Sequence, residues 1–358
     1  MKKGGIDMNT KISATVLFTL LLVNTATLFG TQLRTNNSST NAKKLDNAIS
    51  AYESGKMDKS IRILEEIISH MFDLSVTRRK ALWYLGVCYS AKGNRESARS
   101  SVSRMVQLYP KFAPDPDVFP PKSLELYYEV KREIHGNLLV EQPDPGIQTM
   151  AIADFMNRSI ISERDTYTPL EKGLSDFMIY SLADTAALQI VERDRFQWIL
   201  SEHSINDTND MERAVRAGRL LGVHTVLFGS FMVLNNDDLV LLTRLVKVET
   251  GEILFSERHE GKFDDFIRIV DELGEKIAME INIRQVYQPQ ASVPNTLDAM
   301  LAYSRGKAYM DQEMYIEAFD MFELSLKHDP TYLKAEEQQR RIKPDMLFAM
   351  TKADLTGK

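Results

Sequence analysis

Apolar and polar residues follow two different periods along the chain, and the changes of period divide it into three parts. From residue 45 onwards, and again from residue 296, apolar residues recur at helical spacing. Between residues 148 and 281, short apolar runs of strand length alternate with helical patterns. The sequence therefore predicts a mixed α/β fold class, in which helical regions flank a central α/β domain.

The central part predicts a mixed sheet. Apolar runs of strand length occupy residues 150–155, 188–191, 223–233, 239–248 and 253–260. The last three follow one another closely, so they are expected to form antiparallel hairpins with turns at 235–238 and 249–252. A helical stripe over 170–188 carries Gly173, which would allow close approach to the sheet. A closing helix is expected over 263–281.

Both alternating faces of the run 239–248 carry aliphatic residues. Such a run is typical of a strand that lies inside a sheet and is covered on both sides. We therefore expect Leu242 to be buried.

The helical part before the α/β domain resembles tetratricopeptide repeats. Residues 79–110 place small and large residues at the spacing of that motif. The small residues would let two antiparallel helices touch while the large ones fill the space one turn away. The residues that match are Leu82, Leu85, Gly86, Tyr89, Gly93, Ala98 and Pro110.

Two further copies of the repeat pattern are expected. A weaker one precedes the first, with Ala51, Gly55, Ser60, Leu64 and Ile67 at corresponding offsets. A third spans residues 296–330, with Gly306, Tyr309, Ala318, Phe322 and Pro330 in register. A lone repeat cannot bury its own apolar face, so this third copy should dock on another part of the molecule or on another chain. A charged helix follows over 335–342, and the last residues are expected to fray.

The amino-terminal segment predicts export. Lys2, Lys3 and Lys11 precede an apolar run over residues 14–23, which has the length of a signal-peptide core. An uncleaved anchor is the alternative, because 12–33 is 22 residues long. Polar residues dilute that stretch, so cleavage is favoured. No cysteine lies near its end, and the sequence therefore predicts a periplasmic or envelope-associated protein that is not a lipoprotein.

These patterns give the following division of the chain. It comprises a signal peptide or anchor at 1–33, a polar linker at 34–44, tetratricopeptide-like helices at 45–136, the α/β domain at 146–285, and a repeat with a closing helix at 295–345.

Composition narrows the classes of function. The formal net charge is −6, and no basic run longer than three residues follows residue 33, which argues against nucleic-acid binding. Cys88 is the single cysteine, so an internal disulfide and a cysteine metal site are excluded. Its place inside a predicted helix favours a buried, unreactive thiol.

Several short sequence motifs of the central part, in the order in which they occur, resemble the domain shared by the curli-secretion protein CsgG, the flagellar outer-membrane protein FlgO and the amino-terminal domain of TolB. They are Met-Ala-Ile-Ala-Asp-Phe at 150–155 with Asn157, Val-Glu-Arg-Asp-Arg at 191–195 with Ile199, Leu200 and Glu202, Ala-Gly-Arg-Leu-Leu-Gly-Val at 217–223, Val-Leu-Phe-Gly-Ser at 226–230, and residues 244–254. The resemblance covers roughly 148–283 and implies an envelope protein that assembles or scaffolds and catalyses no reaction. Two features separate this chain from the secretion channel: it lacks the lipidation cysteine, and it lacks a pair of long amphipathic strands that could join a membrane barrel.

Candidate chemistry is sparse. The six histidines (His70, His135, His203, His224, His259 and His328) are scattered without metal-binding spacing, so no single one is expected to be essential. His224 is expected to be packed or hydrogen-bonded. Asp154 follows the first strand, where its carboxylate could pair with Arg193 or Arg195, and a structural ion pair is favoured over catalysis. The sequence predicts no catalytic, cofactor or metal site.

Two functional hypotheses remain. The first is an exported, non-enzymatic interaction or scaffold protein whose helical repeats bind a protein partner, with envelope association, without nucleic acid, and with self-association left open. The second is a sensor whose α/β domain binds a small ligand while the repeats report it. Convergent polar side chains in a pocket between helix and sheet would favour the second, and a filled core beside an exposed repeat groove would favour the first.

Overall fold

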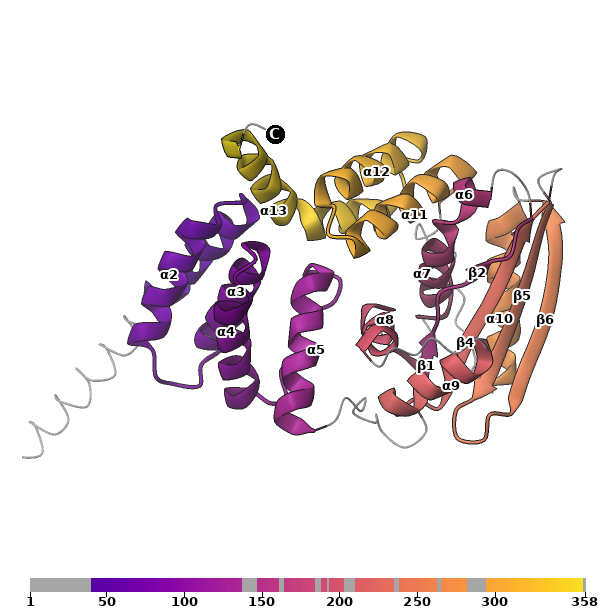
Figure 1. Cartoon of the computed structure of the whole chain (residues 1–358), viewed down its shortest axis with the longest axis horizontal. Coiled ribbons are helices and arrows are strands. Elements are labelled where there is room, and N and C mark those ends of the chain that lie inside the picture. Colours follow the sequence, from indigo (N-terminus) through magenta and orange to yellow (C-terminus); the bar gives the residue numbers. More distant parts are fainter. Residues whose placement is uncertain are drawn as a thin grey trace, which may run out of the picture.

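A mixed sheet with helices on both faces occupies one end of the molecule, and two groups of helices extend from it (Figure 1). The structure is a computed structural model that describes residues 40–136, 147–160, 164–183, 188–191, 193–202, 210–234, 238–262, 265–281 and 294–356. The described part is predominantly helical, as the sequence predicts.

The amino-terminal group consists of five helices, each packed against its neighbour in the chain. A first helix over residues 40–53 is followed by α2 (Met57–His70), α3 (Val76–Ala91), α4 (Arg95–Leu108) and α5 (Pro121–His135). Side-chain oxygens of Ser75 and Asn94 accept backbone N–H groups at the starts of α3 and α4. The first helix already includes residues 40–44, which polar composition assigned to the linker. Lys44 is held there by an ion pair with Glu66 of α2 at 2.5 Å.

The sheet has the strand order β3-β1-β4-β5-β6, with the short β2 also paired to β4. Its strands are β1 (Gln148–Ile152), β2 (Met156–Asn157), β3 (Leu188–Ile190), β4 (Thr225–Val233), β5 (Asp238–Lys247) and β6 (Ile253–Lys262). β1 runs parallel to β3 and to β4, whereas β4, β5 and β6 pair antiparallel. The mixed sheet and both hairpins are therefore confirmed. Residues 235–237 of the first predicted turn lie outside the described residues.

Each sheet face is covered by its own pair of helices. On one face lie α8 (Arg193–Glu202) and α9 (Asp210–Leu221), packed on Ala151 and Val226. On the other lie α7 (Leu170–Ala183) and α10 (Phe266–Glu280), packed on Ile152 and Leu227. The short helix α6 (Arg164–Tyr167) leads into α7. Successive residues of one strand thus belong to two separate apolar clusters, because side chains of a strand point alternately to opposite faces of the sheet.

Coverage of β5 is less complete than its sequence predicts. Leu241 and Leu245 are fully buried, but Leu242 is half-buried and Arg244 is exposed. The reason is that α9 covers this face only at the end of β5 that carries Val246. The expectation that both faces are covered along the whole run is therefore wrong in its middle.

The carboxy-terminal group consists of α11 (Leu297–Asp311), α12 (Tyr315–His328) and α13 (Leu333–Thr356). α11 packs against α7, and the fully buried Tyr303 belongs to the same apolar cluster as Phe177. The third helical hairpin is therefore docked on the α/β domain. Gly173 lies in this contact: a Cβ there would clash with Ser304 of α11, so the glycine permits a helix–helix approach and not the helix–sheet approach that was expected.

The last helix is much longer than predicted and contains Pro344 in its interior. It continues because residues beyond the proline pack on other helices: Met346 is buried in the core, and the half-buried Leu347 lies against the turn at Gly55. Phe348 packs on the amino-terminal cluster, so α13 joins both helical groups. The expected fraying after residue 342 is wrong. Among the helices of the described ranges, none combines the length and the apolarity that a membrane crossing needs.

Candidate functional site

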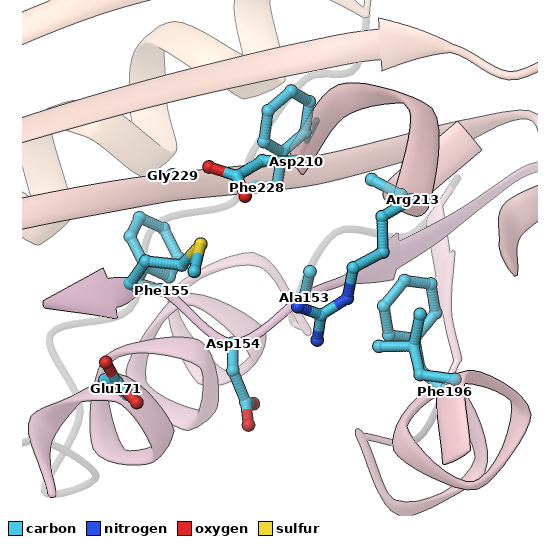
Figure 2. A pocket seen from close by; sticks show the side chains of 12 residues that line it. Ala153, Asp154, Phe155, Glu171, Phe196, Asp210, Arg213, Phe228 and Gly229 are labelled. Atoms are coloured by element: carbon cyan, nitrogen blue, oxygen red, sulfur yellow. The ribbon is translucent and has the colours of Figure 1, made fainter. Parts of the chain in front are cut away.

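The chain reverses its direction of winding at β1, and a small crevice lies at that point. From β1 it reaches β3 through α7 on one face, and from β3 it reaches β4 through α8 and α9 on the other. In open α/β sheets, ligands bind outside the carboxyl ends of strands at such a switch point. Here the crevice has a volume of about 140 Å³ and lies between the segment after β1, the middle of β4, and the helices α8 and α9 (Figure 2).

Charged groups in the crevice differ in whether they are paired. Glu171 accepts the backbone N–H of Asn157, and Asp210 accepts a hydrogen bond from Arg158 at 2.9 Å. Burial raises the pKa of Glu171, and the donated N–H opposes the rise. The Arg213 guanidinium extends toward Ala153 in Figure 2, and it has no ion-pair or hydrogen-bond partner among the described residues. The crevice therefore offers one guanidinium as a donor.

Asp154 forms the structural ion pair that its position predicts. Its two carboxylate oxygens accept hydrogen bonds from Nε and an Nη of Arg193 at 2.8 and 2.9 Å, and Ser175 donates a third at 3.1 Å. The Arg193 side chain is only 3% exposed, so this is a buried, bidentate pair. The alternative partner, Arg195, lies instead over the ring of Tyr128. In Figure 2 the carboxylate of Asp154 points away from Arg213.

The pair extends into a buried ion network that joins the α/β domain to the carboxy-terminal helices. Arg193 also donates to Asp311 of α11 at 3.0 Å, and Lys172 of α7 binds the same carboxylate. Burial alone would raise the pKa of Asp311, but the positive charges of Arg193 and Lys172 outweigh it and lower that pKa. The two groups that meet here are 118 residues apart in the sequence.

A second branch of the network reaches α13. Arg341 donates to Asp194 of α8 at 2.6 Å and to the carbonyl oxygen of Phe119 at 2.5 Å. Lys307 of α11 pairs with Asp176 of α7 at 3.1 Å. Sequence reasoning missed all of these partners except the first pair, because no local pattern connects α7 and α8 with α11 and α13.

Two carboxyl groups near the network have strongly raised pKa values. Burial, followed by the charges of Asp194 and Glu313, raises the pKa of Glu125 on α5 to about 7. Burial also raises the pKa of Asp345 on α13 to about 7, although the hydroxyl of Tyr52 donates to it at 3.4 Å. Both groups lie where helices from the two ends of the chain meet.

Comparison with known families identifies the central part. Residues 139–237 match the model of the family described as curli production assembly/transport component CsgG. The α/β domain is CsgG-like. The matched stretch contains β1 to β4 with α7, α8 and α9, and it ends just before β5. It therefore includes the crevice at the switch point and is shorter than the region 148–283 over which the resemblance was expected.

Solved structures with the same kind of domain are distant. The C-terminal domain of LpoB from Escherichia coli is 18% identical, covering 35% of this chain and 90% of that one at a TM-score of 0.26. The lipoprotein GNA1162 from Neisseria meningitidis is 15% identical, covering 36% and 96% at a TM-score of 0.28. At these scores the likenesses carry no argument about function. A comparison with curated proteins gave no match.

The residues predicted to pack the helical repeats divide into buried and surface positions. Leu82, Leu85, Ala98, Ala318 and Phe322 are buried. A Cβ at Gly86 would lie 2.7 Å from Val102, and one at Gly306 would lie 2.5 Å from the ring of Phe322. Tyr89 and Tyr309 are partly exposed, and Pro110 and Pro330 are exposed at helix ends. The small residues therefore lie where helices approach closely. Assignment of these hairpins to the tetratricopeptide family stays a prediction.

A groove separates the amino-terminal helices from α13. Its volume is about 610 Å³, and one wall carries Tyr52 and Tyr84 from the first helix and α3. The opposite wall carries Arg340 and Lys343 of α13, both exposed. The groove thus combines aromatic surface with cations that extend into solvent.

A second cavity, of about 450 Å³, lies between the edge strand β3 and the helices α7, α11 and α13. Buried charged side chains converge on it, among them Lys307, Asp176 and Arg341. These charges are already paired with one another or with neighbouring residues of the network.

The remaining sequence candidates have ordinary surroundings. His224 accepts the backbone N–H of Thr149 through Nδ1 at 3.0 Å, which confirms a hydrogen-bonded role. Cys88 is buried, and burial raises the pKa of its thiol to about 12. Over the described residues, no group of three histidine, cysteine or acidic side chains could hold a metal ion. His203 lies outside the described residues.

Proposed function

We propose that this chain is an exported, non-enzymatic interaction protein of the cell envelope, in which the CsgG-like domain provides a rigid base and the flanking helices bind a protein partner. The observation that carries the proposal is the match of residues 139–237 to a family described as an assembly and transport component. The crevice is lined by acids and one arginine but by no serine, cysteine, histidine or lysine, so carboxylates are the only nucleophiles among its lining residues.

The groove beside α13 is the proposed partner site. Partner grooves are usually concave and combine aromatic anchors with a few charged groups. Tyr84 supplies partly exposed aromatic surface, whereas Tyr52 is buried, and Arg340 and Lys343 supply exposed positive charge. The acids Glu53, Asp117 and Glu337 also line the groove, so the partner should present an apolar or aromatic side chain next to charged groups of both signs.

Affinity purification from envelope fractions tests the proposal. The full chain with a carboxy-terminal tag would be crosslinked in cells and purified beside the variant Arg340→Glu, Lys343→Glu. The matched control is Lys59→Glu, Arg62→Glu, which reverses two exposed charges on α2 outside the groove. A protein that co-purifies with the wild type and the control but not with the groove variant supports the proposal. An unprocessed chain found only in the cytoplasm, or identical co-purifying proteins for all three chains, would overturn it.

A second candidate function is the sensing of a small charged ligand, which the cavity beside β3 favours. Buried charges of both signs converge there between helices and sheet, and because they are already paired, a zwitterionic molecule would bind by sharing hydrogen bonds with those pairs. Native mass spectrometry of the full chain from its own cells tests this candidate. A bound small molecule that is lost in the variant Lys334→Ala supports it, and an unliganded mass under gentle conditions contradicts it.

A further inference from the structure

The connection between α2 and α3 presents apolar side chains to solvent at three alternate positions. Phe72 is 82% exposed, Leu74 is 66% exposed and Val76 is 57% exposed. Isolated exposed hydrophobic residues are common on soluble proteins, but three within five residues form a continuous apolar tip.

This apolar tip (residues 72–76) is held in place by its own backbone contacts. Arg78 is buried and donates to the carbonyl oxygens of Phe72 and Asp73 at 3.1 and 3.3 Å. The hydroxyl of Tyr109 donates to the carbonyl oxygen of Ser75 at 3.2 Å. The side chain of Ser75 caps α3, as described above. The exposure of the three apolar side chains is therefore built into the fold.

The apolar tip lies at the end of the helical layer where the amino-terminal segment joins. Lys44, one turn after residue 40, pairs with Glu66 in the last turns of α2. The opposite end of the first helix, near Gly55, packs against α13. The connection that follows α2 is thus on the same side as residue 40, at the end of the helices away from α13 (Figure 1).

The apolar run of the amino-terminal segment, 12–33, ends seven positions before residue 40. Seven residues can span at most about 25 Å when fully extended. A bilayer that holds this run as an anchor would therefore lie within about 25 Å of the end that carries the apolar tip.

Exposed lysines lie on the segments next to the apolar tip, which itself contains one exposed acid, Asp73. Lys43 precedes the Lys44 ion pair, Lys80 lies in the first turns of α3, and Lys111 lies next to Phe112, whose ring contacts Arg79. Lysine side chains beside inserted aromatic and aliphatic groups suit the phosphate groups of an anionic lipid surface. A projecting tip also suits a bilayer better than a folded protein partner, which would require a matching concave surface.

We propose that the apolar tip is a membrane-contact site, in which Phe72, Leu74 and Val76 enter the interfacial region of a bilayer that contains anionic phospholipid. The neighbouring lysines bind the headgroups. Three side chains give only weak, reversible attachment, which would fix the orientation of the helices relative to the membrane. If the amino-terminal run is kept as an anchor, the alternative to cleavage, the tip would act as a second contact beside it. This inference goes beyond the proposed function, because it concerns the lipid surface and not the protein partner.

A fluorescent label placed at the apolar tip tests the proposal. The full chain carrying Leu74→Cys would be labelled with an environment-sensitive dye and mixed with vesicles of phosphatidylcholine and phosphatidylglycerol in equal parts. Cys88 does not compete for the label, because it is buried with a raised thiol pKa. The matched control is a label at Met350→Cys, an exposed position of α13 beyond the opposite end of the first helix.

We expect the label at position 74 to show a blue shift and to be quenched by brominated lipid. The label at position 350 should show neither effect. Adding Phe72→Ser and Val76→Ser to the position-74 variant should lower the quenching at least severalfold with unchanged circular dichroism, because both side chains are exposed in the folded chain. Three outcomes would overturn the proposal: a label at 74 that stays in water while the chain is bound to vesicles, an equal response at 350, or a blue shift that appears without lipid and depends on protein concentration, which would indicate self-association. None of these outcomes bears on binding in the groove, so the two proposals fail separately.

Discussion

Replacing Asp345 by Asn should make the folded chain more stable at alkaline pH and leave it almost unchanged at acid pH. The carboxyl group is buried at 5% exposure, and the hydroxyl of Tyr52 donates to it from 3.4 Å. Tyr315 and Glu313 lie near enough to interact with it, and Lys122 supplies the nearest opposing charge. Burial, the largest cause, raises its pKa from the ordinary 3.8 to about 7.

The size and sign of the effect follow from proton linkage. Below the ordinary pKa the carboxyl group is protonated in both folded and unfolded chains, so it contributes no difference. As the pH rises toward 7, the unfolded chain releases the proton first, and the free energy of unfolding falls. Above about pH 7 the loss is complete and amounts to about 4 kcal/mol, since each pKa unit is worth 1.36 kcal/mol. An amide of the same shape carries no charge and avoids this loss.

Urea unfolding of Asp345→Asn and wild type at several values between pH 5 and pH 8.5 would measure the difference. Asp354→Asn is the matched control, because it changes an exposed carboxylate on the same helix. The gain should grow from about 1.5 kcal/mol at pH 5 to about 4 kcal/mol at pH 8.5. A gain that does not vary with pH, or one that the control reproduces, would refute the reasoning that Asp345 is buried and poorly paired.

Three further predictions concern the core. Arg193→Met should cost about 3–5 kcal/mol in urea unfolding, since it leaves the carboxylate of Asp154 without its cation and Asp311 with Lys172 alone; a loss near zero would contradict the network. Leu241→Asp should cost about 3–5 kcal/mol and Leu242→Asp clearly less, because only the first is fully buried; equal losses would mean that the uncovered part of β5 is misplaced. Gly173→Ala should speed hydrogen exchange in α11 without unfolding the sheet, because the added methyl group separates α11 from α7; unchanged exchange there would argue against the close contact.

Prediction from sequence succeeded where the deciding contacts are local in the chain. The antiparallel hairpins follow from short turns between apolar runs, and the pair of Asp154 with Arg193 follows from two charged residues placed just after neighbouring parallel strands. The close approach at Gly86 follows from a small residue at helical spacing from large ones.

Prediction from sequence failed where contacts between distant segments determine the structure. Nothing near Arg193 in the sequence indicates Asp311, and nothing near Asp194 indicates Arg341, because those pairs form only when the last helices dock on the α/β domain. The same docking explains α13, in which burial of Met346 keeps the helix intact past a proline that locally favours a break. Leu242 is only partly covered because of where α9 ends over the sheet. The alternation of residues within β5 gives no information about that position.

The contact between Tyr52 and Asp345 has a consequence for the order of events during synthesis. These two residues are 293 positions apart, so the first helix of the described chain receives part of its packing from a segment that the ribosome makes much later. Domains usually fold as units, from the amino-terminal side, while a chain emerges. The amino-terminal helices share an apolar cluster of their own, but α13 is still absent when α2 and α3 leave the ribosome. The surface that α13 covers therefore stays exposed until that helix has been made, which would expose carboxy-terminally shortened products to proteolysis.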